Sequence, residues 1–223
     1  MAKVISLDDA TKEAFSSDKV MHRPLHGGQC SLDALWVHRI VILRELLSQG
    51  NNLIHSDADA IWVKDPIPEI ENYDDDMVFS QGTFWPRDVH SKRGLVLCCG
   101  FFHLRPSPST FAFLDAVQER MAEDQDDQIA MNRVISGWIG EWKIEEQYEI
   151  PFKDTRFFAS ASPIRSTGTD RNGRAFSISV LPHHSFPRLV KEISDEVVVA
   201  HPLSGKTMEE KEAILGELGL WKV

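Results

Sequence analysis

Two kinds of apolar segment alternate along most of the chain, and this alternation constrains the fold more than any other feature. Short apolar runs predict strands at 3–7, 52–57, 77–80, 95–104, 176–181 and 197–200. Longer segments with helical spacing predict helices at 31–49, 109–122, 127–138 and 207–218. Strands that alternate with helices predict an α/β fold, Rossmann-like, with a central mostly parallel (mixed) sheet and helices on both faces.

Composition narrows the classes of partner. A length of 223 residues predicts one domain over 1–223. The 24 Lys and Arg against 34 Asp and Glu give a net charge of -10, which disfavours nucleic acid and anionic lipid as partners. No apolar stretch approaches the roughly 20 residues of a membrane span. Three cysteines without framework spacing, and no signal-peptide pattern, predict reduced thiols and a cytoplasmic protein.

Two aspartates directly follow the predicted strand at 52–57. The alternating spacing of Asp57 and Asp59 sends both carboxylates to one side of an extended chain, at the strand end where α/β sheets bind ligands. Paired carboxylates suit Mn²⁺ or Mg²⁺, and such an ion can bridge a diphosphate and neutralise a leaving group. The alternative interpretation is an Asp-rich turn, which is common.

Four ordered segments give the chain a specific resemblance. They are "HSDADAIWVKDP" (55–66), "CCGFFHLRPSPST" (98–110), "DDQIAMN" (126–132), and "HPLSGK" (201–206) with "GLW" (219–221). Together they resemble the DxD-containing nucleotide-diphospho-sugar transferase family of GT-A fold. The resemblance implies a hexosyl- or pentosyltransferase that uses a UDP- or GDP-sugar donor. It implies a saccharide, glycoconjugate or protein as acceptor.

The chain departs from the family pattern in two places. The family's Asn-Ser-Gly is Cys98-Cys99-Gly100 here, which puts a sugar contact by that Asn in doubt. The resemblance still implies Asp57 and Gly100 as substrate-binding residues. The chain also starts near the family's second strand, so either "KVISLDD" holds the nucleobase, with Asp8 near the ribose, or the base pocket is reduced. Neither Cys98 nor Cys99 has the sequence partners of a zinc or nucleophile site.

Charged and polar side chains lie on the apolar faces of two predicted helices. Arg39 lies on the stripe of the helix at 31–49, where it is either a structurally paired arginine or a partner of Asp57, Asp59 or the donor diphosphate. Asp127 and Gln128 extend the stripe of the helix at 127–138. Asp127 is therefore either a helix cap or a favourable first-turn acid, or it is, with Gln128, a catalytic residue that serves the sugar or deprotonates an acceptor hydroxyl.

A histidine and a lysine follow the last predicted strand. The run "VVVA" (197–200) predicts an interior strand, and His201 comes directly at its end. His201 is therefore a candidate third metal ligand beside the two aspartates. A turn at Gly205 would bring Lys206 back to hold the diphosphate. Each residue alone is equally compatible with a loop His and a solvated Lys.

Two other function classes remain open at this point. One is a module that binds a nucleotide sugar without turnover. The other is a metal-dependent phosphohydrolase that uses the same aspartate pair. Transfer or hydrolysis of a donor with Mn²⁺ would separate the first from a transferase, and release of phosphate from simple phosphoesters would identify the second.

Overall fold

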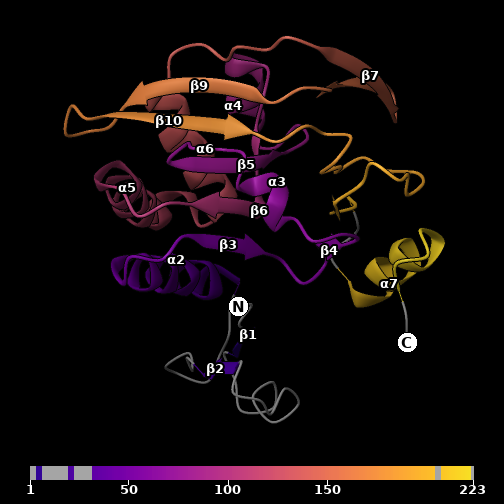
Figure 1. Cartoon of the computed structure of the whole chain (residues 1–223), viewed down its shortest axis with the longest axis horizontal. Helices are drawn as coiled ribbons and strands as arrows, with labels where there is room; N and C mark the ends of the chain where they lie inside the picture. Colours follow the sequence, from indigo (N-terminus) through magenta and orange to yellow (C-terminus); the bar gives the residue numbers. More distant parts are fainter. Residues whose placement is uncertain (1–3, 7–19, 23–31, 204–206, 222–223) are drawn as a thin grey trace.

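The computed structural model describes residues 4–6, 20–22, 32–203 and 207–221 (Figure 1). The helices are α2 (Leu32–Ser48), α3 (Ile67–Ile70), α4 (Arg87–Arg93), α5 (Pro108–Asp124), α6 (Asp127–Trp138) and α7 (Met208–Glu217). The strands are β1 (Val4–Ser6), β2 (Val20–His22), β3 (Leu53–Ser56), β4 (Ile61–Trp62), β5 (Met77–Gln81), β6 (Leu97–Leu104), β7 (Gln147–Phe152), β8 (Thr155–Ser160), β9 (Ile164–Thr169), β10 (Ala175–Val180) and β11 (Val199–Ala200). The predicted α/β fold is confirmed.

The central sheet is mixed, as expected, but its pairing is mainly antiparallel. Its order is β3-β6-β5-β10-β9, and only the ladder between β5 and β10 is parallel. The prediction of a mostly parallel sheet is therefore wrong. The physical reason is that β6 runs between β3 and β5 in the opposite direction to both, and alternation of strands and helices along a sequence does not reveal this direction.

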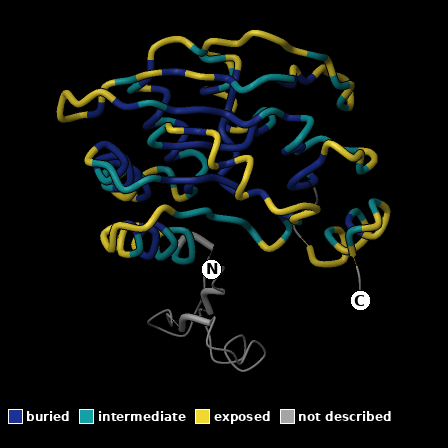
Figure 2. Tube along the Cα trace, viewed as in Figure 1, coloured by how far each residue is buried: buried dark blue, intermediate teal, exposed yellow. Residues whose placement is uncertain are grey.

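Two apolar clusters cover the two faces of this sheet. Helices α2, α5 and α6 pack on one face, where Ile40, Phe113 and Met131 belong to one buried cluster with Phe79 and Phe102 of the sheet. On the other face, α3 and the segment before β11 cover the sheet through Ile70, Phe186, Val198, Val78 and Phe101. Figure 2 shows that the central strands β5 and β6 are buried, whereas exposed segments lie at the periphery. Within the described residues, no helix combines the length and the apolar content needed to cross a lipid bilayer.

A bulge interrupts β6 near one end of the sheet. Phe79 of β5 pairs with Phe102, but the next residue, Ser80, pairs with Cys98, so residues 99–101 bulge out of this ladder. The bulge turns Cys99 and Phe102 towards the helix-covered face. It also lies beside the end of β3, where Ser56 pairs with Phe101. The chain that leaves β3 therefore runs directly past the bulge.

A separate two-stranded ladder lies next to this end of the sheet. Strand β4 pairs with β11 in antiparallel register, with Ile61 opposite Ala200 and Trp62 opposite Val199. The prediction that 197–200 forms an interior strand of the main sheet is therefore wrong, although all four residues are buried. Their burial comes from packing against the sheet face, which gives the same β-branched, apolar sequence pattern as an interior strand.

Candidate metal centre

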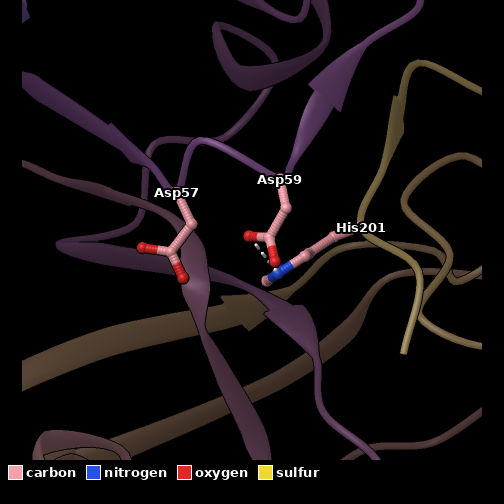
Figure 3. Close-up of side chains that lie close together, drawn as sticks. All are labelled: Asp57, Asp59 and His201. Carbon is pink, nitrogen blue, oxygen red and sulfur yellow. Dashed lines mark ion pairs between the residues drawn. The ribbon is translucent and has the colours of Figure 1, made fainter. Parts of the chain in front are cut away.

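Three predicted ligands meet beyond the end of β3. Ligand atoms of Asp57, Asp59 and His201 all lie within 4.8 Å of one another (Figure 3). The β4–β11 ladder explains the meeting, because pairing of Ile61 with Ala200 brings the residue after β11 beside the loop before β4. Among the described residues, no other group of three His, Cys, Asp or Glu side chains has this geometry.

Gly100 makes the close approach of these groups possible. A Cβ at this position would lie 2.0 Å from Cε1 of His201 and 2.8 Å from Oδ2 of Asp57. The backbone of the bulge also holds the loop, because the amide of Asp57 donates to the carbonyl of Gly100 at 2.7 Å. Two carboxylates and one imidazole form a donor set that suits Mn²⁺ or Mg²⁺, so the residues present fit a divalent cation.

Asp59 contacts two basic side chains, His201 and Lys211. Its Oδ1 lies 3.3 Å from Nε2 of His201, and its Oδ2 accepts a hydrogen bond from Nζ of Lys211 on α7. The hydrogen bond from His201 and the contact with Lys211 hold the pKa of Asp59 well below its usual range. Asp59 is therefore ionised at neutral pH and available to a cation.

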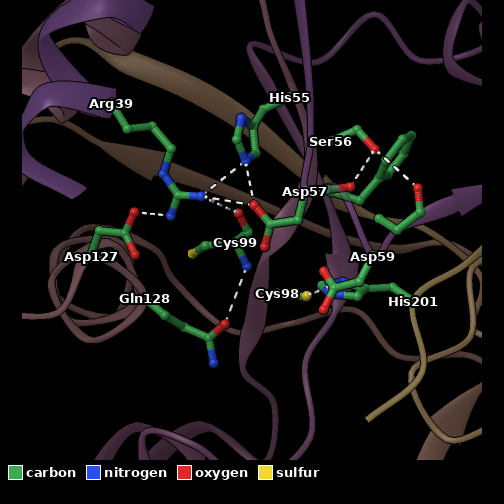
Figure 4. A network of polar contacts seen from close by, with 12 residues as sticks. Arg39, His55, Ser56, Asp57, Asp59, Cys98, Cys99, Asp127, Gln128 and His201 are labelled. Carbon is green, nitrogen blue, oxygen red and sulfur yellow. Dashed lines mark hydrogen bonds and ion pairs between the residues drawn. The ribbon is translucent and has the colours of Figure 1, made fainter. Parts of the chain in front are cut away.

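Asp57 belongs to a second set of contacts, which is more buried. Its Oδ1 accepts from Nη1 of Arg39 at 3.1 Å and lies 3.0 Å from Nε2 of His55 (Figure 4). Burial alone would raise the pKa of Asp57, but the hydrogen bond from His55 and the charges of Arg39 and His201 lower it. Burial lowers the pKa of His55, so this imidazole is neutral at pH 7.

Arg39 links Asp57 to the helix that carries the predicted catalytic pair. Its Nη2 forms an ion pair with Oδ2 of Asp127, which is buried at the start of α6. The helix cap is a different residue, since the side chain of Asp126 accepts from the amide of Ile129 at 2.9 Å. The interpretation of Asp127 as the cap is therefore wrong, because its carboxylate faces inward to Arg39.

Gln128 connects the same helix turn to the bulge. Its Oε1 accepts from the amide of Cys99 at 3.3 Å, and its Nε2 donates to the carbonyl of Trp85 at 2.9 Å. The side chain therefore spans between β6 and the loop before α4. Of the other predicted residues, Gly100 lies against His201 and Asp57, whereas Lys206 and Asp8 lie outside the described residues.

Three residues of this site were not singled out from the sequence. His55 precedes Asp57 by two positions, so the alternation that pairs Asp57 with Asp59 could have identified it. Lys211 lies on a helix face with no distinguishing pattern. Cys98, which has no partner in sequence, lies with its Sγ 3.5 Å from Nδ1 of His201. Burial alone would raise the pKa of this thiol, but the charges of Arg188 and His201 lower it to about 6.

Comparison of the sequence with known proteins identifies its family. The sequence model of the family described as nucleotide-diphospho-sugar transferase matches residues 4–211, which is most of the chain. The chain belongs to the nucleotide-diphospho-sugar transferase family. Neither a search of curated proteins nor a search of solved structures returned a match.

Membership of the family assigns a reaction class to the chain, which is transfer of a sugar from a nucleotide-diphosphate donor. The matched span includes both aspartates of the cluster and the histidine that joins them from the far end of the chain. The candidate metal centre therefore lies within the span that the family model matches.

Proposed function

We propose that this nucleotide-diphospho-sugar transferase is a metal-dependent glycosyltransferase, with Mn²⁺ or Mg²⁺ held by Asp57, Asp59 and His201. The observation that carries the proposal is the meeting of their ligand atoms within 4.8 Å at the end of β3. The lowered pKa of Asp57 and of Asp59 supports it, because an ionised carboxylate is the form that binds a cation. When bound, the ion would neutralise charge on the departing diphosphate.

The donor is a nucleotide-diphosphate sugar, with UDP or GDP as the nucleotide, and the acceptor is a hydroxyl of a saccharide, glycoconjugate or protein. We assign Asp57 and Gly100 to binding of the donor, because the backbone at Gly100 lies directly against Asp57 and His201 of the cluster. Arg39 donates a hydrogen bond to Asp57, which orients that carboxylate, and it places a positive charge beside the site. Lys206 is proposed to hold the diphosphate, as a compact cation near the same end of the chain.

Asp127 and Gln128 are the proposed catalytic pair. Both project from the first turn of α6, and Gln128 reaches the bulge that carries Gly100. We assign Gln128 to the sugar, because its amide offers both a donor and an acceptor. We assign Asp127 to proton transfer from the acceptor hydroxyl, with Arg39 paired to its carboxylate.

The proposal is tested by incubating the protein with UDP- and GDP-sugars, with and without Mn²⁺, and measuring released nucleoside diphosphate and phosphate. A metal-dependent transferase releases nucleoside diphosphate, through slow donor hydrolysis or transfer to an added saccharide. Asp57→Asn/Asp59→Asn should abolish this release, whereas Asp154→Asn, a matched change at an exposed loop residue, should not. Tight donor binding without release would identify a binding module, and phosphate from simple phosphoesters would identify a phosphohydrolase.

A further inference from the structure

Cys98 lies against the one histidine of the candidate metal centre. Its Sγ is 3.5 Å from Nδ1 of His201, although the two residues are 103 positions apart in sequence (Figure 4). The thiol is buried, with 1% of the residue exposed.

The two ring nitrogens of His201 face different partners. Nε2 lies 3.3 Å from Oδ1 of Asp59, on the side of the cluster, while Nδ1 faces the sulfur. The ring has little freedom to exchange these positions. Gly100 lies against its Cε1 edge, and Nη1 of Arg188 donates to the carbonyl of His201 at 3.0 Å, which fixes the backbone.

A histidine that binds a metal through one nitrogen donates the proton of the other to an acceptor, which fixes its tautomer and its ring orientation. A cysteine sulfur can accept such a proton at a distance longer than that of an oxygen acceptor. Sγ of Cys98 lies within hydrogen-bonding distance of Nδ1 of His201 and is therefore placed to be this acceptor.

We propose that Cys98 is a positioning residue for His201: its sulfur accepts a hydrogen bond from Nδ1–H, so that the lone pair of Nε2 is free to bind the divalent cation beside Asp59. The inference rests on the proposed function, because it assigns to Cys98 a part in holding the same ion. Cys98 touches neither substrate nor metal in this account, and it acts only through the imidazole.

Mn²⁺ affinity, measured by calorimetry on the purified full chain, tests the inference. Cys98→Ala should weaken Mn²⁺ binding by roughly 10–100-fold, the usual effect of removing such a supporting contact. Cys98→Ser should retain most of the affinity, because its hydroxyl can accept the same proton. Cys99→Ala is the matched control, since its side chain packs into the apolar core on the opposite side of β6 and its loss should leave Mn²⁺ affinity unchanged.

A second readout does not depend on Mn²⁺ affinity. Nitrogen-15 NMR of the protein saturated with Mg²⁺, which is diamagnetic, should show an exchange-protected Nδ1–H of His201 in the parent and in Cys98→Ser. In Cys98→Ala this proton should exchange faster with water, because it has lost its acceptor. Should Cys98→Ala unfold, the parent and Cys98→Ser still decide, because absence of the protected Nδ1–H signal in the parent would overturn the inference.

The two possible failures are distinguishable. If the parent binds Mn²⁺ in a way that depends on Asp57 and Asp59, but Cys98→Ala and Cys99→Ala have equal affinity, Cys98 has no positioning role and the metal centre stands. If the parent binds no Mn²⁺, the proposed function fails.

Discussion

The guanidinium of Arg39 on α2 forms an ion pair with the buried carboxylate of Asp127 on α6, which lies 88 residues further along the chain. The same guanidinium donates to Asp57 at 3.1 Å. One arginine therefore balances two carboxylates of the site. It also connects the candidate metal ligand to the candidate base.

Arg39→Met should lower the free energy of unfolding by about 3–5 kcal/mol, because it leaves Asp127 as an uncompensated buried charge. Adding Asp127→Asn to Arg39→Met should restore part of the loss, since the charge is then removed. Urea denaturation of the parent, both single variants and the double variant measures this coupling. Additive effects of the two substitutions would show that the ion pair contributes nothing.

Gly100→Ala should weaken Mn²⁺ binding by more than about 10-fold, because the new Cβ would overlap the ring of His201 and crowd Asp57. Gly137→Ala is the control. Nothing lies within 4 Å of a Cβ at Gly137 in α6, so this change should leave Mn²⁺ affinity unchanged and stabilise the helix by about 0.5–1 kcal/mol. Calorimetric titration of Mn²⁺ into both variants tests this expectation. Equal Mn²⁺ affinities of Gly100→Ala and Gly137→Ala would contradict the proposed crowding.

Lys211→Met should raise Mn²⁺ affinity in the absence of nucleotide by roughly threefold, a modest factor because the Lys211 side chain is about one-third exposed. The reason is that its ammonium competes with the ion for Oδ2 of Asp59. Lys64→Met removes the same charge at an exposed position and controls for the change in net charge. A weaker affinity in Lys211→Met than in Lys64→Met would mean that Lys211 supports the metal site.

Most elements of the fold were predictable because their apolar periodicity is strong. Helices α2, α5 and α6 and strands β3, β5, β6 and β10 fall within a few residues of the predicted segments. The direction of β6 was not predictable, because the sequence of a buried strand does not indicate whether the neighbouring strand is parallel or antiparallel to it. The predicted strand at 197–200 is longer than the two-residue strand β11. The reason is that burial against a sheet face and burial inside a sheet favour the same residue types.

The site was predictable only in part, for a similar reason. Asp57 and Asp59 are close in sequence, so strand geometry alone relates them. His201 joins them through the β4–β11 ladder, and only the resemblance to the family linked it to them. The contacts of Cys98 and Lys211 depend on the bulge in β6 and on the placement of α7. Neither of these has a signal in the local sequence.

His183 should make the protein less stable as the pH falls from 7 to 4. Its Nε2 accepts from the amides of Arg188 and Leu189 at 3.2 and 3.4 Å, so its Nδ1 proton donates to Tyr148 Oη, and protonation of Nε2 would break both backbone contacts.

Burial, with the charges of His184 and Arg188, lowers the pKa of His183 to about 4. The unfolded chain, with an ordinary histidine pKa of about 6.5, therefore binds more protons between these values, and stability falls with pH through this window. His183→Gln should be less stable at pH 7 and should lose less stability on acidification. Urea denaturation at pH 7 and 4.5 measures both effects, and equal pH dependence in parent and variant would contradict the assignment.

The central claim is that Asp57, Asp59 and His201 form one divalent-cation site in a sugar transferase. Calorimetric titration of Mn²⁺ into the parent, Asp57→Asn/Asp59→Asn, His201→Ala and Asp154→Asn tests it most directly. The account predicts one site in the parent and in Asp154→Asn, weakened binding in His201→Ala and none in the double variant. Unchanged Mn²⁺ affinity in Asp57→Asn/Asp59→Asn, with all four proteins folded, would contradict it.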